Sequence, residues 1–438
     1  MRLNSNPATS NSVNSAADKA FQLLPEATSL HVLTLTPFFP SRENEVRGCF
    51  VKEPLDALTM LGVTSTVIAV APIHHRRQHP SPAAPAKWVR YPQVPGTIGL
   101  SSAGRFLYAR LFRDVANVHA ARPIDIIHAH AALPCGQAAS LLAQRLRIPY
   151  IVTVHGLDVF NTCFLVGAPA EWRRRASIAA YERASMVICI SRKVQKTLQD
   201  GMRDRVRSTV VYNGTDAELF SPGISSDRPI FPALPSLEML SPEMPSPCMP
   251  EQARQEILVV GNLNASKGQD LVLRAIHSIA AAFPHLQCRI VGEGPDRDCL
   301  QALADELGIR QRVNFLGRLS RAEVADAMRR CSMFVLPSSN EGLGCVYLEA
   351  MASAKPVIGC RGQGIEEIVE HQKNGWLISP NNLDELEQAL LTLLRSPELS
   401  LQIGDAARKT VVNGLALSHQ AQQMAAIYRE TSAARLAG

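Results

Sequence analysis

Short apolar runs alternate with longer amphipathic segments along most of this chain. Val, Ile and Leu dominate the runs at 31–36, 150–154, 257–260 and 333–336, and turn-forming or polar residues bound them. Runs of this length are typical of strands buried on both faces of a parallel sheet. Segments such as 50–61, whose apolar residues recur three and four positions apart, predict helices between the strands. The alternation of strands and helices predicts an α/β protein.

A Pro-rich stretch divides this alternation into two parts. Residues 223–255 carry repeated Leu-Pro, Ser-Pro and Met-Pro pairs, which disfavour strands and helices, so we interpret them as a linker or insertion. We expect Rossmann-like domains at 30–222 and 256–412 and a closing helix within 413–438. The start, 1–29, is rich in Ser, Asn, Ala and Thr without an apolar signal core, and we expect a disordered tail there.

Composition narrows the class of protein. A chain of 438 residues predicts two to four domains, and it lacks the ~20 consecutive apolar residues that cross a bilayer. Ten cysteines without a C-x-x-C pair favour a reducing cytoplasm. Residues 1–222 contain 25 Lys and Arg against 15 Asp and Glu, whereas the remainder contains 20 against 24. A basic N-terminal half favours an acidic acceptor or an anionic membrane, although ordinary solvated arginines explain it equally well.

The stretch 338–357 contains the strongest candidate site. A glycine-bearing loop, 341–344, lies between the apolar run 333–336 and a segment of strong helix formers. Open α/β sheets bind ligands where a strand ends and a helix begins, because free N–H groups and the helix dipole favour a phosphate there. Glu341 and Glu349 could then hold the two ends of one ligand. The alternative is a loop charge and an unrelated helix surface charge.

The whole string resembles the Glu-x7-Glu signature of retaining glycosyltransferases of family 4, which have the GT-B fold, two Rossmann-like domains facing across a cleft. The resemblance runs from about residue 30 through nearly the whole chain. It implies that Glu341 contacts the donor sugar, that the amides of Gly342, Leu343 and Gly344 face sugar and phosphate, and that Glu349 binds the nucleotide ribose. It also implies that the closing helix packs back toward the N-terminal domain.

Two further positions match this family, and a third departs from it. His155 follows the predicted strand 150–154 and precedes a glycine, like the cleft histidine that contacts the donor sugar; the alternative is a histidine satisfied in the core. Lys267 follows a predicted strand end, where a lysine suits a diphosphate as a point charge. Many relatives carry Arg at the position of Asn262, so a second cationic phosphate contact is in question, and Asn262 remains a possible hydrogen-bond donor.

Other glycine-containing segments carry weaker signals. The string around Gly48 resembles the opening of bacterial polysaccharide and teichuronic-acid-type members, whose glycine loop lies close to the cleft; a simple turn explains it equally well. We expect Gly317 and Arg318 to border the nucleotide base. His128 and His130 are interpreted as structural, because no ligand follows at metal spacing, and no metal site is predicted.

The resemblance implies a hexosyltransferase-type enzyme that transfers a sugar, with retained anomeric configuration, from a UDP- or GDP-linked donor to an acceptor hydroxyl. Its catalytic residues would be Glu341, His155 and Lys267, without metal or cofactor. The expected setting is synthesis of cell-surface polysaccharide or glycolipid, on a glycan or lipid-linked acceptor.

We further expect a cytoplasmic protein at the inner face of the plasma membrane, and no nucleic-acid partner, since the chain lacks nucleic-acid-binding motifs. The alternative function is a non-catalytic nucleotide-sugar or glycan-binding protein on the same scaffold. A transfer assay would separate the two functions.

Overall fold

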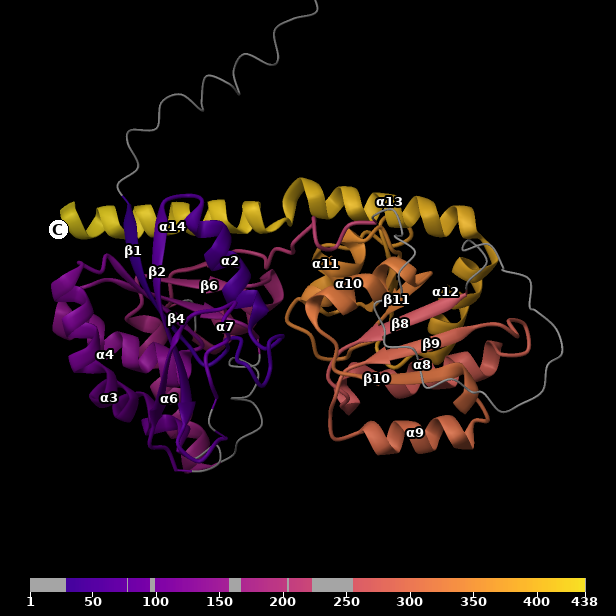
Figure 1. The fold of residues 1–438 in the computed structure, drawn as a ribbon, viewed down its shortest axis with the longest axis horizontal. Coiled ribbons are helices and arrows are strands. Elements are labelled where there is room, and N and C mark those ends of the chain that lie inside the picture. The colour runs from indigo at the N-terminus through magenta and orange to yellow at the C-terminus, as the bar shows by residue number, and fades with distance from the viewer. Residues whose placement is uncertain are drawn as a thin grey trace, which may run out of the picture.

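Two parallel sheets organise the part of the chain that the structure describes (Figure 1). The computed structural model describes residues 29–76, 78–94, 99–156, 167–202, 205–222 and 255–437. The expected tail and Pro-rich insertion lie outside these residues, apart from one position at an end of each. Among the described helices, none is long and apolar enough to cross a membrane.

The N-terminal sheet has seven parallel strands in the order β3-β2-β1-β4-β5-β6-β7. The strands are β1 (Leu30–Thr36), β2 (Val63–Pro72), β3 (Lys87–Tyr91), β4 (Ile126–His130), β5 (Tyr150–Val154), β6 (Met186–Cys189) and β7 (Ser208–Val210). The helices are α2 (Cys49–Thr59), α3 (Leu100–Ala121), α4 (Gln137–Leu146), α6 (Ala168–Glu182) and α7 (Arg192–Met202).

The C-terminal sheet has six parallel strands in the order β10-β9-β8-β11-β12-β13. The strands are β8 (Glu256–Val260), β9 (Gln287–Val291), β10 (Val313–Gly317), β11 (Met333–Val335), β12 (Val357–Cys360) and β13 (Trp376–Ile378). The helices are α8 (Gln269–Ile279), α9 (Arg297–Glu306), α10 (Arg321–Arg330), α11 (Cys345–Ala352), α12 (Leu383–Arg395), α13 (Pro397–Gly414) and α14 (Leu417–Ala437).

The predicted strands with continuous apolar runs are present, and most strands that prediction missed are at sheet edges. Every residue of β1, β5 and β8 is buried, as expected for parallel strands covered on both faces. Prediction missed β3, β7 and β13, which lie at sheet ends, and the short β12, which lies between β11 and β13. The edge strand β3 alternates exposed and buried residues over only five positions, so its apolar signal is weak.

The last helix connects the two sheets. Figure 1 shows α13 along the C-terminal half and α14 continuing over the N-terminal half. α14 packs against α2, and the Tyr428 hydroxyl lies 2.7 Å from Nδ1 of His128 on β4. Both side chains are fully buried. The C-terminal segment therefore completes the core of the N-terminal half.

Replacing Tyr428 with Phe should destabilise the protein without changing its fold. The substitution keeps the ring but leaves Nδ1 of buried His128 without this partner, a loss of about 1–3 kcal/mol. Urea denaturation monitored by fluorescence measures it. Tyr108→Phe, on a partly buried ring of α3, is the control, and equal stability of both variants would contradict the proposed importance of the contact.

Candidate active site

The candidate residues gather where the strand order of each sheet reverses. Chain order reverses between β1 and β4 in one sheet and between β8 and β11 in the other. Ligands of open α/β sheets bind at such points, outside the carboxyl ends of the strands. Lys267 follows β8 and Glu341 follows β11, and His155 follows β5 beside β4 in the facing sheet. The topology thus places these three side chains at sheet edges that can share one ligand.

Lys267 and Glu341 form an ion pair, although 74 residues separate them. Lys267 ends a short 3₁₀ helix (Ala265–Lys267). The Ser338 hydroxyl donates to the Ser266 carbonyl at 3.0 Å and lies 3.4 Å from Oε2 of Glu341. The two ionic side chains are only 18% and 16% exposed. A lysine ammonium has three donors, so Lys267 can bind a phosphate while it retains Glu341.

The loop 341–344 contacts the N-terminal half directly. The Ser191 hydroxyl donates to the Gly342 carbonyl at 2.7 Å, and a Cβ on Gly342 would lie 3.2 Å from the His155 carbonyl oxygen. Glycine at 342 therefore permits the close approach of the two halves. Leu343 is fully buried, so only its backbone can face a ligand, and Gly344 is the N-cap of α11.

A second contact between the halves was not predicted from sequence. The carboxylate of Glu367 accepts the backbone N–H groups of Arg192 and Lys193 at 2.7 Å each and the Tyr212 hydroxyl at 2.9 Å. Arg192 begins α7, so the carboxylate binds the positive end of that helix. Gln363 accepts from the Lys193 ammonium at 2.5 Å and from the Glu341 N–H at 2.9 Å. These bonds hold the halves together beside the candidate site.

His155 lies in a cluster of aromatic rings. Its Nε2 is 3.0 Å from Nδ1 of His130, and the two rings stack at 5.2 Å. Phe38 and Phe50 pack against the same imidazole. Burial lowers the pKa of His155 to about 3, so at neutral pH the ring is uncharged and acts through hydrogen bonds. His130, interpreted as structural from sequence, therefore also orients His155.

Glu349 lies deeper than the other candidates. It is the fifth residue of α11, is 3% exposed and pairs with the Arg321 guanidinium. Arg321 begins α10 behind a Ser320 cap. Sequence reasoning missed Arg321 because an arginine in a first helical turn carries no motif.

The remaining candidates lie in the segments that follow β1 and β8 and at the end of β10. Gly48 is the N-cap of α2 at φ 76°, and a Cβ there would lie 2.4 Å from the Phe38 carbonyl carbon, so the close turn requires glycine. Asn262 is exposed in the loop after β8. Gly317 ends the edge strand β10 and Arg318 is exposed. Among the described residues, no hydrogen bond or ion pair joins Gly317 or Arg318 to Lys267, Glu341 or Glu349.

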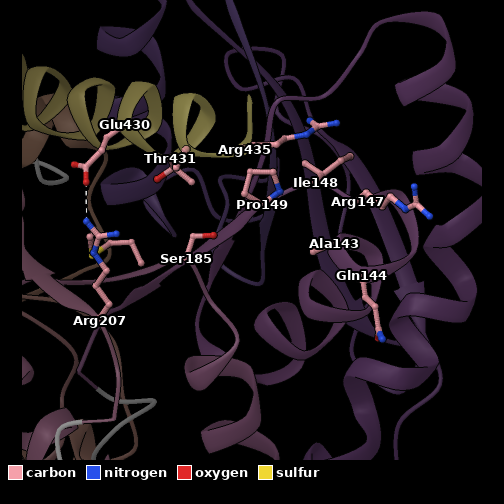
Figure 2. Close-up of a pocket in the computed structure, with 12 residues that line it drawn as sticks. Ala143, Gln144, Arg147, Ile148, Pro149, Ser185, Arg207, Glu430, Thr431 and Arg435 are labelled. Atoms are coloured by element: carbon pink, nitrogen blue, oxygen red, sulfur yellow. Dashed lines mark hydrogen bonds and ion pairs between the residues drawn. The ribbon is translucent and has the colours of Figure 1, made fainter. Parts of the chain in front are cut away.

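A cavity of about 460 Å³ lies elsewhere, between α14 and the segments that precede β5 and β6 (Figure 2). Figure 2 shows Arg207 paired with Glu430 on one side and Arg147 and Arg435 on the other. Pro149 and Ser185 line the cavity just before the strands begin. Because His155 follows the opposite end of β5, this cavity is separate from the candidate site. Among the described residues, no group of three His, Cys, Asp or Glu side chains could hold a metal ion.

Both halves of the chain match known protein families. Residues 50–219 match the family described as Glycosyltransferase Family 4, and residues 250–410 match Glycosyl transferases group 1. An uncharacterised glycosyltransferase of Methanocaldococcus jannaschii is 30% identical over 67% of this chain and 72% of its own length. D-inositol 3-phosphate glycosyltransferase of Corynebacterium glutamicum is 28% identical over 65% of this chain and 67% of its own.

Solved structures share the arrangement of the two sheets. Sucrose-phosphate synthase of Thermosynechococcus elongatus has a TM-score of 0.70 at 20% identity, covering 92% of this chain and all of that one. The Anabaena protein HepE, solved with UDP-glucose, has a TM-score of 0.66 at 19% identity over the same shares. The expected GT-B fold is confirmed.

Replacing Lys267 with Ala should weaken nucleotide binding roughly ten- to hundredfold, because a hydrogen bond to a charged group contributes about 1.5–3 kcal/mol. Calorimetry with free UDP and GDP measures the change. Lys373→Ala removes an exposed ion pair in the same half and is the control. Equal affinity of both variants would exclude Lys267 from the donor site.

The buried histidines predict a loss of stability in acid. Burial lowers the pKa of His128 and His155 to about 3 and that of His130 well below its ordinary value, whereas an unfolded histidine titrates near about 6.5. Below pH ~6.5 the unfolded chain binds more protons, so the free energy of unfolding should be highest above this pH and fall toward pH ~3. Each histidine that stays neutral in the folded state lowers the free energy of unfolding by up to about 1.4 kcal/mol per pH unit below pH ~6.5.

Urea denaturation over this pH range measures the dependence, which His130→Gln should make shallower. The exposed His285→Gln should leave it unchanged. A wild-type stability that is constant across the range would refute the explanation.

Proposed function

We propose that this chain, which belongs to the glycosyltransferases, transfers a sugar from a nucleotide-sugar donor to an acceptor hydroxyl. Its N-terminal half matches Glycosyltransferase Family 4 and its C-terminal half matches Glycosyl transferases group 1. The observation that carries the proposal is the Lys267–Glu341 pair at the point where strand order reverses in the C-terminal sheet. That position suits a diphosphate, because the N-terminus of α11 and the Lys267 ammonium both lie there.

The donor would lie in the C-terminal half, with its sugar toward the N-terminal half. Lys267 would bind the diphosphate, Glu341 the sugar and Glu349 the ribose. Gly342 belongs to the C-terminal half and contacts the N-terminal half, so its neighbour Glu341 would be well placed for a sugar between them. The neutral His155 imidazole would hydrogen-bond a sugar hydroxyl, which an imidazolium could do only as a donor.

Catalysis on this proposal is positioning and electrostatic stabilisation. Negative charge develops on the leaving diphosphate as the glycosidic bond breaks, and Lys267 stabilises it. The acceptor oxygen bonds to the anomeric carbon on the face from which the diphosphate leaves, and the diphosphate takes the acceptor proton, so the anomeric configuration is retained. We propose a hexosyl donor and a reaction that needs no metal ion.

A membrane surface would supply the acceptor, as a lipid-linked glycan. α3 and α6 pack together in the N-terminal half and carry six arginines against three acidic residues. Phe106 and Trp172 on these helices are 47% and 57% exposed. Exposed aromatic rings among arginines suit an anionic bilayer, in which the rings enter the interface and the cations meet the headgroups.

The direct test is transfer from a panel of UDP- and GDP-sugars to glycan and lipid-linked acceptors, with the anomer of the product assigned by NMR. Release of nucleotide together with a retained anomer is the expected result. Donor binding without turnover on any acceptor would favour the non-catalytic alternative. An inverted product would refute the proposed mechanism.

Glu341→Gln and Glu349→Gln should fail in different ways. Glu349 would serve the ground and transition states alike, so its loss should raise KM and weaken free-nucleotide binding. Glu341 would act on a sugar that gains positive charge in the transition state, so its loss should lower kcat with little change in nucleotide affinity. Steady-state kinetics and calorimetry measure both, and the same defect in both variants would show that the roles are misassigned.

Trp172→Ala should reduce sedimentation of the protein with vesicles rich in phosphatidylglycerol, because the ring would no longer enter the interface. Salt should weaken the remaining binding. Leu401→Ala on the C-terminal half, also at an exposed apolar residue, is the matched control. Binding that is absent in the wild type, or insensitive to salt, would end the membrane proposal.

A further inference from the structure

Arg321 lies at the centre of an ionic cluster that joins the two halves. Its Nε and Nη2 donate to the two carboxylate oxygens of Glu53 at 2.9 and 3.0 Å. Its Nη1 donates to Oε1 of Glu349. The guanidinium carbon lies 4.7 Å from the centre of the Phe220 ring. All three nitrogens and one face of the guanidinium therefore have a partner.

The contacts of Arg321 come from both sides of the interface. Glu53 belongs to α2 and Phe220 to the segment after β7, both in the N-terminal half, whereas Arg321 and Glu349 belong to the C-terminal half. Two parallel N–H···O bonds fix the direction of a guanidinium, which a lysine cannot reproduce. The N-terminal half thereby sets the orientation of the Arg321 group that binds Glu349.

The negative charges of this cluster outnumber its positive charge. Two carboxylates face one cation where the side chains of Glu53 and Arg321 are each 18% exposed and that of Glu349 is 4% exposed. Burial raises the pKa of Glu53, and the Glu349 charge adds to that rise against the opposing effect of Arg321. A buried ion cluster is costly unless further hydrogen-bond donors complete it. The hydroxyls of a ribose are donors of the required kind.

We propose that Arg321 is a positioning residue that couples closure of the two halves, through Glu53, to the orientation of Glu349 for the ribose diol. The proposal rests on the proposed role of Glu349 in nucleotide binding. When the halves separate, Arg321 loses Glu53 and Phe220, and Glu349 loses a fixed partner. Coupling of this kind is reciprocal, so bound nucleotide favours closure by the factor by which closure favours nucleotide.

Glu53→Gln tests the coupling, because the hydrogen bonds that link Glu53 to Glu349 among the described residues run through Arg321. Calorimetry with UDP and GDP on the full chain should show affinity about five- to tenfold lower, within the usual range of coupling between sites. Arg321→Lys keeps the charge but not the paired geometry, and should lose at least as much. Small-angle scattering should show a smaller compaction by nucleotide in both variants.

Two controls separate coupling from general loss of stability. Asp56→Asn removes an exposed ion pair on the same helix, and Tyr212→Phe removes a different hydrogen bond between the halves. Asp56→Asn should bind nucleotide nearly as well as the wild type. Tyr212→Phe should lose less affinity than Glu53→Gln, because it removes a contact between the halves but leaves Arg321 and Glu349 paired. In a Glu349→Gln background, Glu53→Gln should cause little further loss, because coupled residues are not additive.

The possible results are distinct. The coupling would be overturned if Glu53→Gln lowered the melting temperature but bound nucleotide as well as Tyr212→Phe. The proposed function would then stay intact, provided that Glu349→Gln binds nucleotide more weakly than the wild type. Full additivity of Glu53→Gln and Glu349→Gln would also overturn it. A Glu349→Gln variant with unchanged affinity would refute the ribose role of Glu349 and this inference with it. A wild-type protein that binds neither nucleotide would refute the proposed UDP- or GDP-linked donor as well.

Discussion

Both sheets are wholly parallel over the described residues, and this constraint decides where the chemistry lies. Parallel strands all have their carboxyl ends along the same edge of the sheet, so the loops that follow the strands gather at that edge. Lys267, Glu341 and His155 come from three such loops. Once the two edges face each other, side chains far apart in sequence share one site without any specialised local structure.

The contacts between the facing edges are polar and directed. The Glu367 carboxylate binds the start of α7, the Ser191 hydroxyl binds Gly342, and Arg321 binds Glu53. Each bond requires a defined relative position of the halves, which apolar packing alone would not. Small relative movement of the halves therefore changes the surroundings of Glu341 and Glu349.

Much of this arrangement follows from sequence patterns, and its limits have a physical cause. The apolar runs predicted the central strands, and a loop with two glycines between strand and helix located Glu341 and its neighbours. Short edge strands such as β3 were missed, because half of their residues face solvent. The partners of Arg321 were also missed, since Glu53 is 268 residues away and no local pattern records which acid a buried arginine meets.

The His128–Tyr428 contact means that the fold cannot be divided where the chain divides. A fragment that ended before the Pro-rich stretch would contain every strand of the first sheet but not the helix that covers it. The core of that sheet is complete only after the ribosome has made α14, whose Tyr428 lies 300 residues after His128. A chimera that exchanges donor specificity between relatives must therefore take two segments from one parent, with the final helix accompanying the first half rather than the second.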